Sequence, residues 1–157
     1  MVKFALRGIA AGLAGGLVFG IMMQMMTAPA PDGGRMPMME MVAMVVESNN
    51  LAIGWLYHLF NSAVIGLIFG VVAADRLQSG KMVVGAGAVY GVVWWVLGAL
   101  ILMPMLLGMP IFAPLRMEEM IPVAMGSLMG HLIFGVILGG VYHWMRQPGF
   151  SRLLQQT

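Results

Sequence analysis

Four long apolar stretches without a single charged residue constrain this chain more than any other feature of its sequence. They cover residues 9–26, 51–74, 82–103 and 121–142. A hydrocarbon core of about 30 Å is crossed by roughly 20 helical residues, so each stretch is long enough to span a bilayer. Only 9% of the residues are charged, against roughly 25% in an ordinary soluble domain. The sequence therefore predicts an all-α polytopic membrane protein with four transmembrane helices.

The basic residues predict how these helices are oriented. Six of the eight flank helix ends that lie on the same side, namely Lys3, Arg7, Arg76, Lys81, Arg146 and Arg152. The other two connections carry Arg35, Arg116 and five of the six acidic residues. By the positive-inside rule, both termini and the middle connection are expected to be cytoplasmic, in a bacterial-type inner membrane. The net charge of +2 thus reports orientation in a lipid bilayer and predicts no nucleic-acid partner.

An internal repeat emerges when the sequence is shifted against itself by 73 positions without a gap. The shift aligns Gly12 with Gly85, Pro31 with Pro104, Met36-Pro37 with Met109-Pro110, Met44 with Met117, His58-Leu59 with His131-Leu132, and Gly66 with Gly139. We predict one membrane domain built from two parallel two-helix repeats, at about 8–74 and 81–147. A pseudo-two-fold axis along the membrane normal would relate them.

The first 30 residues resemble a secretory signal peptide, because Lys3 and Arg7 precede an apolar run that ends near Ala28-Pro29-Ala30. The repeat argues against cleavage, since the first span has a counterpart in the third. The chain also has no cysteine, which excludes a disulfide framework, a thiolate metal site and a cysteine nucleophile.

Glycines recur every fourth residue from Gly8 to Gly20, and similar pairs occur in the other spans. Small residues at this spacing indicate close helix packing in a bilayer, with a gap for a flat cofactor as the alternative. Residues 36–47 are predicted as a short amphipathic helix on the outer surface, with Pro37 in its first turn. Asn50 is expected to cap the second span. Residues 104–120, which contain three prolines, should be less regular.

The candidate site is a pair of histidines, His58 and His131, which the repeat places at equivalent positions. Neutral imidazole binds iron, copper and zinc, and two of them on facing helices suit haem b or another metal. Asn61, Ser127 and Gln24 are the candidate hydrogen-bond partners that would orient the two imidazoles. In the alternative interpretation each histidine only hydrogen-bonds such a neighbour or a backbone carbonyl, and thereby holds helices together. A proton relay or a substrate-binding role is a third possibility.

The nineteen methionines offer a second kind of candidate site. Several cluster at the outer end of the first span, where Met22 and Met26 stand one helical turn apart. Thioethers are soft ligands suited to Cu(I), so the pair is a candidate for handling copper. Methionine is equally an ordinary filler of apolar gaps.

No pattern typical of an enzyme is present: the serines lack a nucleophile elbow, and no phosphate-binding glycine loop precedes a lysine. We therefore expect a non-enzymatic protein, either an accessory subunit of a larger membrane complex or a self-associating bundle. The competing hypothesis is an oligomeric transporter or channel, because four helices are few for a pore within one chain.

Pro104, Gly108 and Pro110, followed by Gly130-His131-Leu132, give the second half a family resemblance. This half resembles the YagU-type family of small bacterial inner-membrane proteins, which pair a glycine-rich span and a Pro/Gly break with a span opening on Gly-His-Leu. The resemblance implies a multi-span bacterial membrane protein. It transfers no functional residue, since the acidic and aromatic content of the connections differs here.

Overall fold

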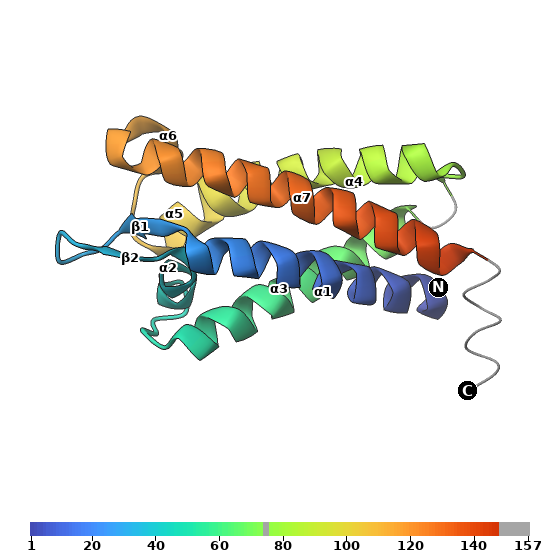
Figure 1. Cartoon of the computed structure of the whole chain (residues 1–157), viewed down its shortest axis with the longest axis horizontal. Coiled ribbons are helices and arrows are strands. Elements are labelled where there is room, and N and C mark those ends of the chain that lie inside the picture. The colour runs from blue at the N-terminus through green and yellow to red at the C-terminus, as the bar shows by residue number, and fades with distance from the viewer. Residues whose placement is uncertain (74–75, 148–157) are drawn as a thin grey trace.

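Four helices that are long and apolar enough to cross a membrane dominate the structure, a computed structural model that describes residues 1–73 and 76–147. The spans are α1 (Val2–Met25), α3 (Leu51–Ala73), a composite of α4 (Gly80–Trp94), η1 (Trp95–Leu102) and α5 (Met103–Leu106), and a last span formed mainly by α7 (Ile121–Arg146) (Figure 1). The segment η1 is π-helical. This confirms the prediction of an all-α polytopic protein, and the chain is a multi-pass membrane protein.

The helices extend beyond the apolar stretches from which they were predicted. Lys3 and Arg7 lie within α1, and Arg146 is the last residue of α7. Residue 74 and Arg152, which entered the sequence analysis, lie outside the described residues.

The connection from α1 to α3 begins with a small hairpin that the sequence analysis did not predict. Strand β1 (Thr27–Pro29) pairs antiparallel with β2 (Arg35–Pro37). The turn contains Gly33 at a φ of +83°, a conformation that glycine adopts without steric cost. The Arg35 side chain closes the hairpin by donating hydrogen bonds to the hydroxyl and the carbonyl oxygen of Thr27.

The helix predicted over residues 36–47 is present as α2 (Met38–Met44), which starts directly after Pro37. Five of its seven side chains are buried, and it packs against α3 at one end of the bundle. The helix therefore closes that end rather than lying on its surface. Asn50 caps α3 as predicted, because its Oδ1 accepts a hydrogen bond from the backbone N–H of Ala52 at 2.9 Å.

The equivalent connection after α5 contains two short helices, α6 (Ala113–Arg116) and η2 (Glu118–Met120). Pro114 lies in the first turn of α6, where its missing N–H costs no hydrogen bond, and Pro104 lies in α5 directly after the π-helical segment η1. Phe112 donates its backbone N–H to the carbonyl of Leu100 at 2.8 Å and so ties this connection back to η1.

Glycine contacts hold α1 against α3. A Cβ added to Gly8 would collide with the carbonyl of Gly66, and one added to Gly12 would collide with the carbonyl of Ser62 and the Cα of Gly66. Only glycine permits this approach of two backbones, which supplies the close packing that stabilises helix pairs in lipid. The predicted role of the glycine ridge in packing is confirmed at these positions.

The contacts between α4 and α7 correspond to those between α1 and α3. Gly87 lies against Gly135 and Gly139, as Gly12 lies against Ser62 and Gly66. The ungapped shift had paired Gly12 with Gly85 instead, but no described atom lies within 4 Å of a Cβ added to Gly85. A shift of 73 residues thus relates α3 to α7. The shift that relates α1 to α4 is two residues longer. The duplication itself remains a prediction.

The two helix pairs meet closely along one side only. Gly15 of α1 lies against the backbone of Phe134 in α7, and Gly130 of α7 lies against the ring of Phe19. A two-fold relation would bring α4 equally close to α3, yet these helices make few contacts. The structure therefore has a closed side, between α1 and α7, and an open side, between α3 and α4.

An aromatic cluster joins the helices of the open side near the end of the bundle where α1 begins. Phe69 of α3 lies 5.4 Å from Tyr90 of α4 and 5.7 Å from Tyr142 of α7, measured between ring centroids. The Tyr90 hydroxyl donates to the carbonyl of Ile65, and the Tyr142 hydroxyl donates to that of Gly70, both at 3.0 Å. These bonds hold α4 and α7 against α3 near the end of the bundle where α1 begins.

The register of the glycine contacts is tested by two alanine substitutions in α4. Gly87→Ala should lower the free energy of unfolding by about 1–3 kcal/mol, the usual cost of overpacking. Gly85→Ala should leave stability unchanged or slightly raised, because alanine is the better helix former. Unfolding in mixed micelles with increasing denaturing detergent measures both variants, and equal costs at the two positions would contradict this packing.

The ends of the bundle also test the predicted orientation. Figure 1 places the start of α1, the beginning of α4 and the end of α7 at the same end, which we call the inner end. Since the chain has no cysteine, single cysteines report accessibility cleanly. A membrane-impermeant maleimide should label Asp32→Cys in intact cells and Gln78→Cys only after permeabilisation. The reverse pattern would mean that the positive-inside assignment is wrong.

Candidate functional site

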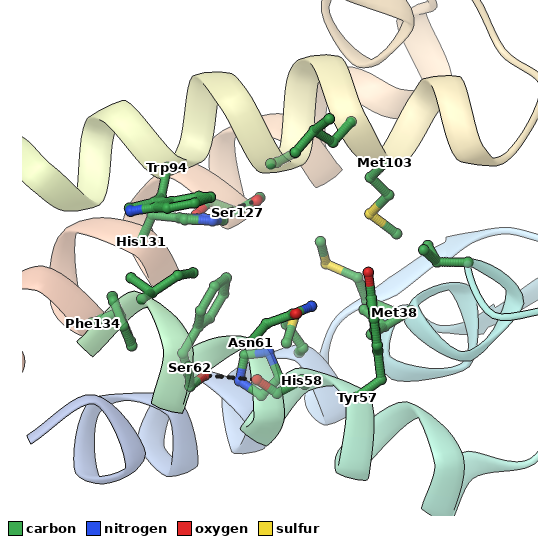
Figure 2. A pocket seen from close by; sticks show the side chains of 18 of the residues that line it. Met38, Tyr57, His58, Asn61, Ser62, Trp94, Met103, Ser127, His131 and Phe134 are labelled. Carbon is green, nitrogen blue, oxygen red and sulfur yellow. Dashed lines mark hydrogen bonds between the residues drawn. The ribbon is translucent and has the colours of Figure 1, made fainter. Parts of the chain in front are cut away.

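A cavity of about 230 Å³ occupies the outer half of the open side. Residues of α1, α2, α3, α7 and the stretch from Trp94 to α5 line it. Figure 2 shows the two predicted histidines on facing elements, with Met38 of α2 and Met103 of α5 nearer to the outer end. Met38 and Val42 of α2 line the outer end of the cavity, and Ile65, Trp94 and Phe134 line the part nearer to the aromatic cluster.

His58 bonds across the helix interface. Its Nε2 lies 2.8 Å from the carbonyl oxygen of Gly16 in α1. A carbonyl only accepts hydrogen bonds, so this nitrogen carries the proton, and in the neutral ring Nδ1 is an acceptor. The adjacent Ser62 hydroxyl donates to the backbone carbonyl of His58 at 2.8 Å. The polar groups of α3 are thereby tied to its own backbone and to α1.

His131 bonds within its own helix. Its Nδ1 lies 2.8 Å from the carbonyl oxygen of Ser127, one turn earlier in α7, and 3.3 Å from the Ser127 hydroxyl oxygen. By the same reasoning Nδ1 carries the proton and Nε2 is the acceptor. The two histidines occupy equivalent positions in the sequence, but only His58 crosses to a neighbouring helix. Both have the backbone bonds that the packing interpretation describes, and each retains one acceptor nitrogen.

Phe19 lies against both imidazoles. Its ring centroid is 5.5 Å from that of His58 and 4.7 Å from that of His131, in edge-on arrangements. This buried ring occupies the space beside the two histidines, and the cavity is smaller than the roughly 300–1,000 Å³ of ordinary ligand pockets. The arrangement does not fit a haem clamped between His58 and His131.

The remaining candidate residues fall into three groups. Ser127 bonds to His131 as described, and Asn61 lines the cavity beside His58. Gln24 lies outside the cavity lining and accepts a hydrogen bond from the indole of Trp55 at 3.3 Å. Met22 and Met26 also lie outside it. Met26 packs its thioether against Gly126 of α7, which is the gap-filling role of methionine.

The lining residues that were not proposed for the site from the sequence include Met38, Tyr57, Trp94 and Met103. Tyr57 stands four residues before Asn61, one helical turn away, so the polar face of α3 could have been extended to it. The other three carried no usable signal. Met38 and Met103 are two of nineteen methionines, and Trp94 belongs to a span that is apolar all round, so its periodicity does not identify an inward face.

Leucine substitutions distinguish the contributions of His58 and His131 to stability. His58→Leu should lower the free energy of unfolding by about 1 kcal/mol, the scale of an interhelical hydrogen bond in a membrane. His131→Leu should be close to neutral, because its partner Ser127 lies on the same helix. Unfolding of both variants in mixed micelles provides the comparison. A larger loss for His131→Leu would show that its contacts across helices outweigh the bond of His58.

The chain matches one family model, described as a family of unknown function (DUF6789), over residues 2–151. It therefore belongs to that family. No curated protein and no solved structure matches the chain. The matched family is not the YagU-type family that the second half resembles, and that relationship remains a prediction.

Proposed function

We propose that this member of the family of unknown function DUF6789 is a non-enzymatic membrane protein that binds a small ligand in the cavity around His58 and His131. The observation that carries the proposal is a set of polar groups with unused hydrogen-bonding capacity in an otherwise apolar, membrane-embedded cavity. They are Nδ1 of His58, Nε2 of His131, the side-chain amide of Asn61 and the buried indole N–H of Trp94, for which the described part of the chain provides no hydrogen-bond partner.

The cost of polar groups in a bilayer supports this proposal. Ionisable and amide side chains at membrane depth are expensive, and they mark sites and pathways when they face a cavity. The bonds to Gly16 and Ser127 account for one nitrogen of each ring only. A bound ligand that hydrogen-bonds the remaining groups would repay the cost of leaving them unpaired.

Cu(I) is a second candidate ligand, favoured by the kinds of atoms that line the cavity. The sulfurs of Met38 and Met103 come from facing elements (Figure 2) and share the cavity lining with His131. Thioether and imidazole ligands suit copper, and a metal-binding histidine usually donates its other N–H to a carbonyl, as His131 does to Ser127. The thioether ligands proposed here are therefore Met38 and Met103 of the cavity, in place of Met22 and Met26, which were the candidates from the sequence.

The cellular setting that we propose is the bacterial inner membrane, with both termini in the cytoplasm. There the protein would act as an accessory subunit of a larger complex or as a homo-oligomer. Transport through an oligomer is the alternative. A monomeric mass in mild detergent would count against transport, since four helices are few for a pore.

The ligand is tested by native mass spectrometry and metal analysis of protein extracted gently from its own membrane. We expect an adduct or stoichiometric copper in the wild type. Ala99→Leu should abolish it, because Ala99 lines the cavity and the added carbons would occupy the space. Ala10→Leu is the matched control, on an exposed face of α1 outside the cavity lining. An empty wild-type protein, or an adduct equally present in Ala99→Leu, would contradict the proposal.

A further inference from the structure

We propose that the ligand is a neutral molecule dissolved in the membrane, with an apolar body and a hydroxyl head that donates a hydrogen bond, and that it enters sideways between α3 and α4. This inference rests on the proposed function and specifies the chemical class of the ligand. The state of the two histidines, the composition of the cavity wall and the position of its opening each support one part.

The histidines determine the polarity of the head group. Backbone carbonyls hold the proton on Nε2 of His58 and on Nδ1 of His131, so the remaining nitrogen of each neutral ring is an acceptor. The same lining contains the indole N–H of Trp94, a donor without a partner among the described residues, so a ligand that both donates and accepts satisfies the most groups. A ketone or an ether presents only acceptors and would leave both nitrogens unpaired, whereas an alcohol or a phenol satisfies at least one of them.

Asn61 and Tyr57 complete the recognition of a hydroxyl. Both line the cavity on the same helix as His58, one turn or less away. An amide and a phenol each offer a donor as well as an acceptor. They can therefore donate a hydrogen bond to the oxygen of a ligand hydroxyl that itself donates to a histidine. Figure 2 shows Asn61 next to His58 and Tyr57 nearer to Met38.

The cavity wall excludes an organic ligand with an ionic head group. Its described lining contains no Lys, Arg, Asp or Glu, so an ionic head group would have no counter-charge at membrane depth, where unpaired charges are costly. The rest of the wall is formed by aromatic, aliphatic and methionine side chains. The available volume of about 230 Å³ is below the roughly 300–1,000 Å³ of ordinary ligand pockets, so the body of the ligand is small.

The opening lies toward lipid rather than toward water. Val64 of α3, Leu102 of η1 and Leu106 of α5 line the cavity and are themselves 39%, 48% and 58% exposed. These three residues form what we call the mouth. Helix α2 covers the outer end and the aromatic cluster joins the helices at the inner end, so the mouth between α3 and α4 is the apolar entrance that remains. A ligand that partitions into the bilayer reaches it directly.

A matched pair of photoreactive probes tests this inference. Octanol and octanone carrying the same diazirine on the chain are added to the full chain in lipid nanodiscs, and labelled peptides are quantified by mass spectrometry. Octanol should label peptides of the cavity about fivefold more than octanone, the effect of one net hydrogen bond. Asn61→Leu and His131→Leu should each reduce the labelling by octanol and leave that by octanone unchanged.

The entrance is tested with tryptophan substitutions in the same assay. Val64→Trp at the mouth should slow octanol labelling of the cavity at least fivefold. Val89→Trp, on the exposed face of α4 and 66% exposed in the wild type, should not. Comparable labelling in both variants would overturn entry through the mouth.

The outcomes separate this inference from the proposed function. Equal cavity labelling by octanol and octanone would overturn the donor head and leave a ligand-binding cavity in place. Absence of cavity labelling by either probe would overturn the chemical class proposed here. The proposed function fails separately, if native protein carries neither a cavity-dependent adduct nor copper.

Discussion

The close approach of glycine backbones is the interaction on which the rest of this structure depends. In lipid the apolar surface of a helix gains nothing by leaving its surroundings, so association relies on close packing at small residues. Gly12 against Gly66 and Gly87 against Gly139 provide this in the two helix pairs. With each pair fixed in this way, α1 and α7 can pack along the closed side while α3 and α4 remain apart.

The departure from two-fold symmetry is what creates the candidate site. On the closed side Phe19 fills the space next to Gly130. On the open side the equivalent positions, Trp94 and Tyr57, line a cavity. The histidines follow the same division, because His58 bonds to α1 whereas His131 bonds within α7. The two predicted repeats thus provide unlike environments, and the unpaired polar groups of His58, Asn61 and His131 line the cavity of the open side.

The sequence predicted the helices well and the site in part. Runs of apolar residues determine four spans regardless of tertiary context, and Asn50 was recognisable as a cap from its position before an apolar run. The hairpin at residues 27–37 was missed because its strands are three residues each, too short to have a period. The two-residue offset of Gly87 was missed because an ungapped alignment forces one register on both helices of a repeat.

The structure places both histidines in the lining of the cavity, but their surroundings could not be predicted from the sequence. Whether two equivalent histidines share a ligand depends on the side chain between them, and Phe19 gave no signal in a span of similar residues. The separation of α3 and α4 was equally hidden, since both carry glycines that suggested close packing.

The central claim is the difference between the closed and open sides, and disulfide cross-linking in nanodiscs tests it most directly. Gly15→Cys with Phe134→Cys spans the closed side, where a Cβ built on Gly15 lies 3.5 Å from the Cα of Phe134, close enough for a disulfide. Tyr90→Cys with Asn61→Cys is the equivalent pair on the open side. We predict rapid oxidation of the first pair and little of the second. Equal cross-linking of both pairs would mean a symmetric bundle without the cavity, and would contradict this account.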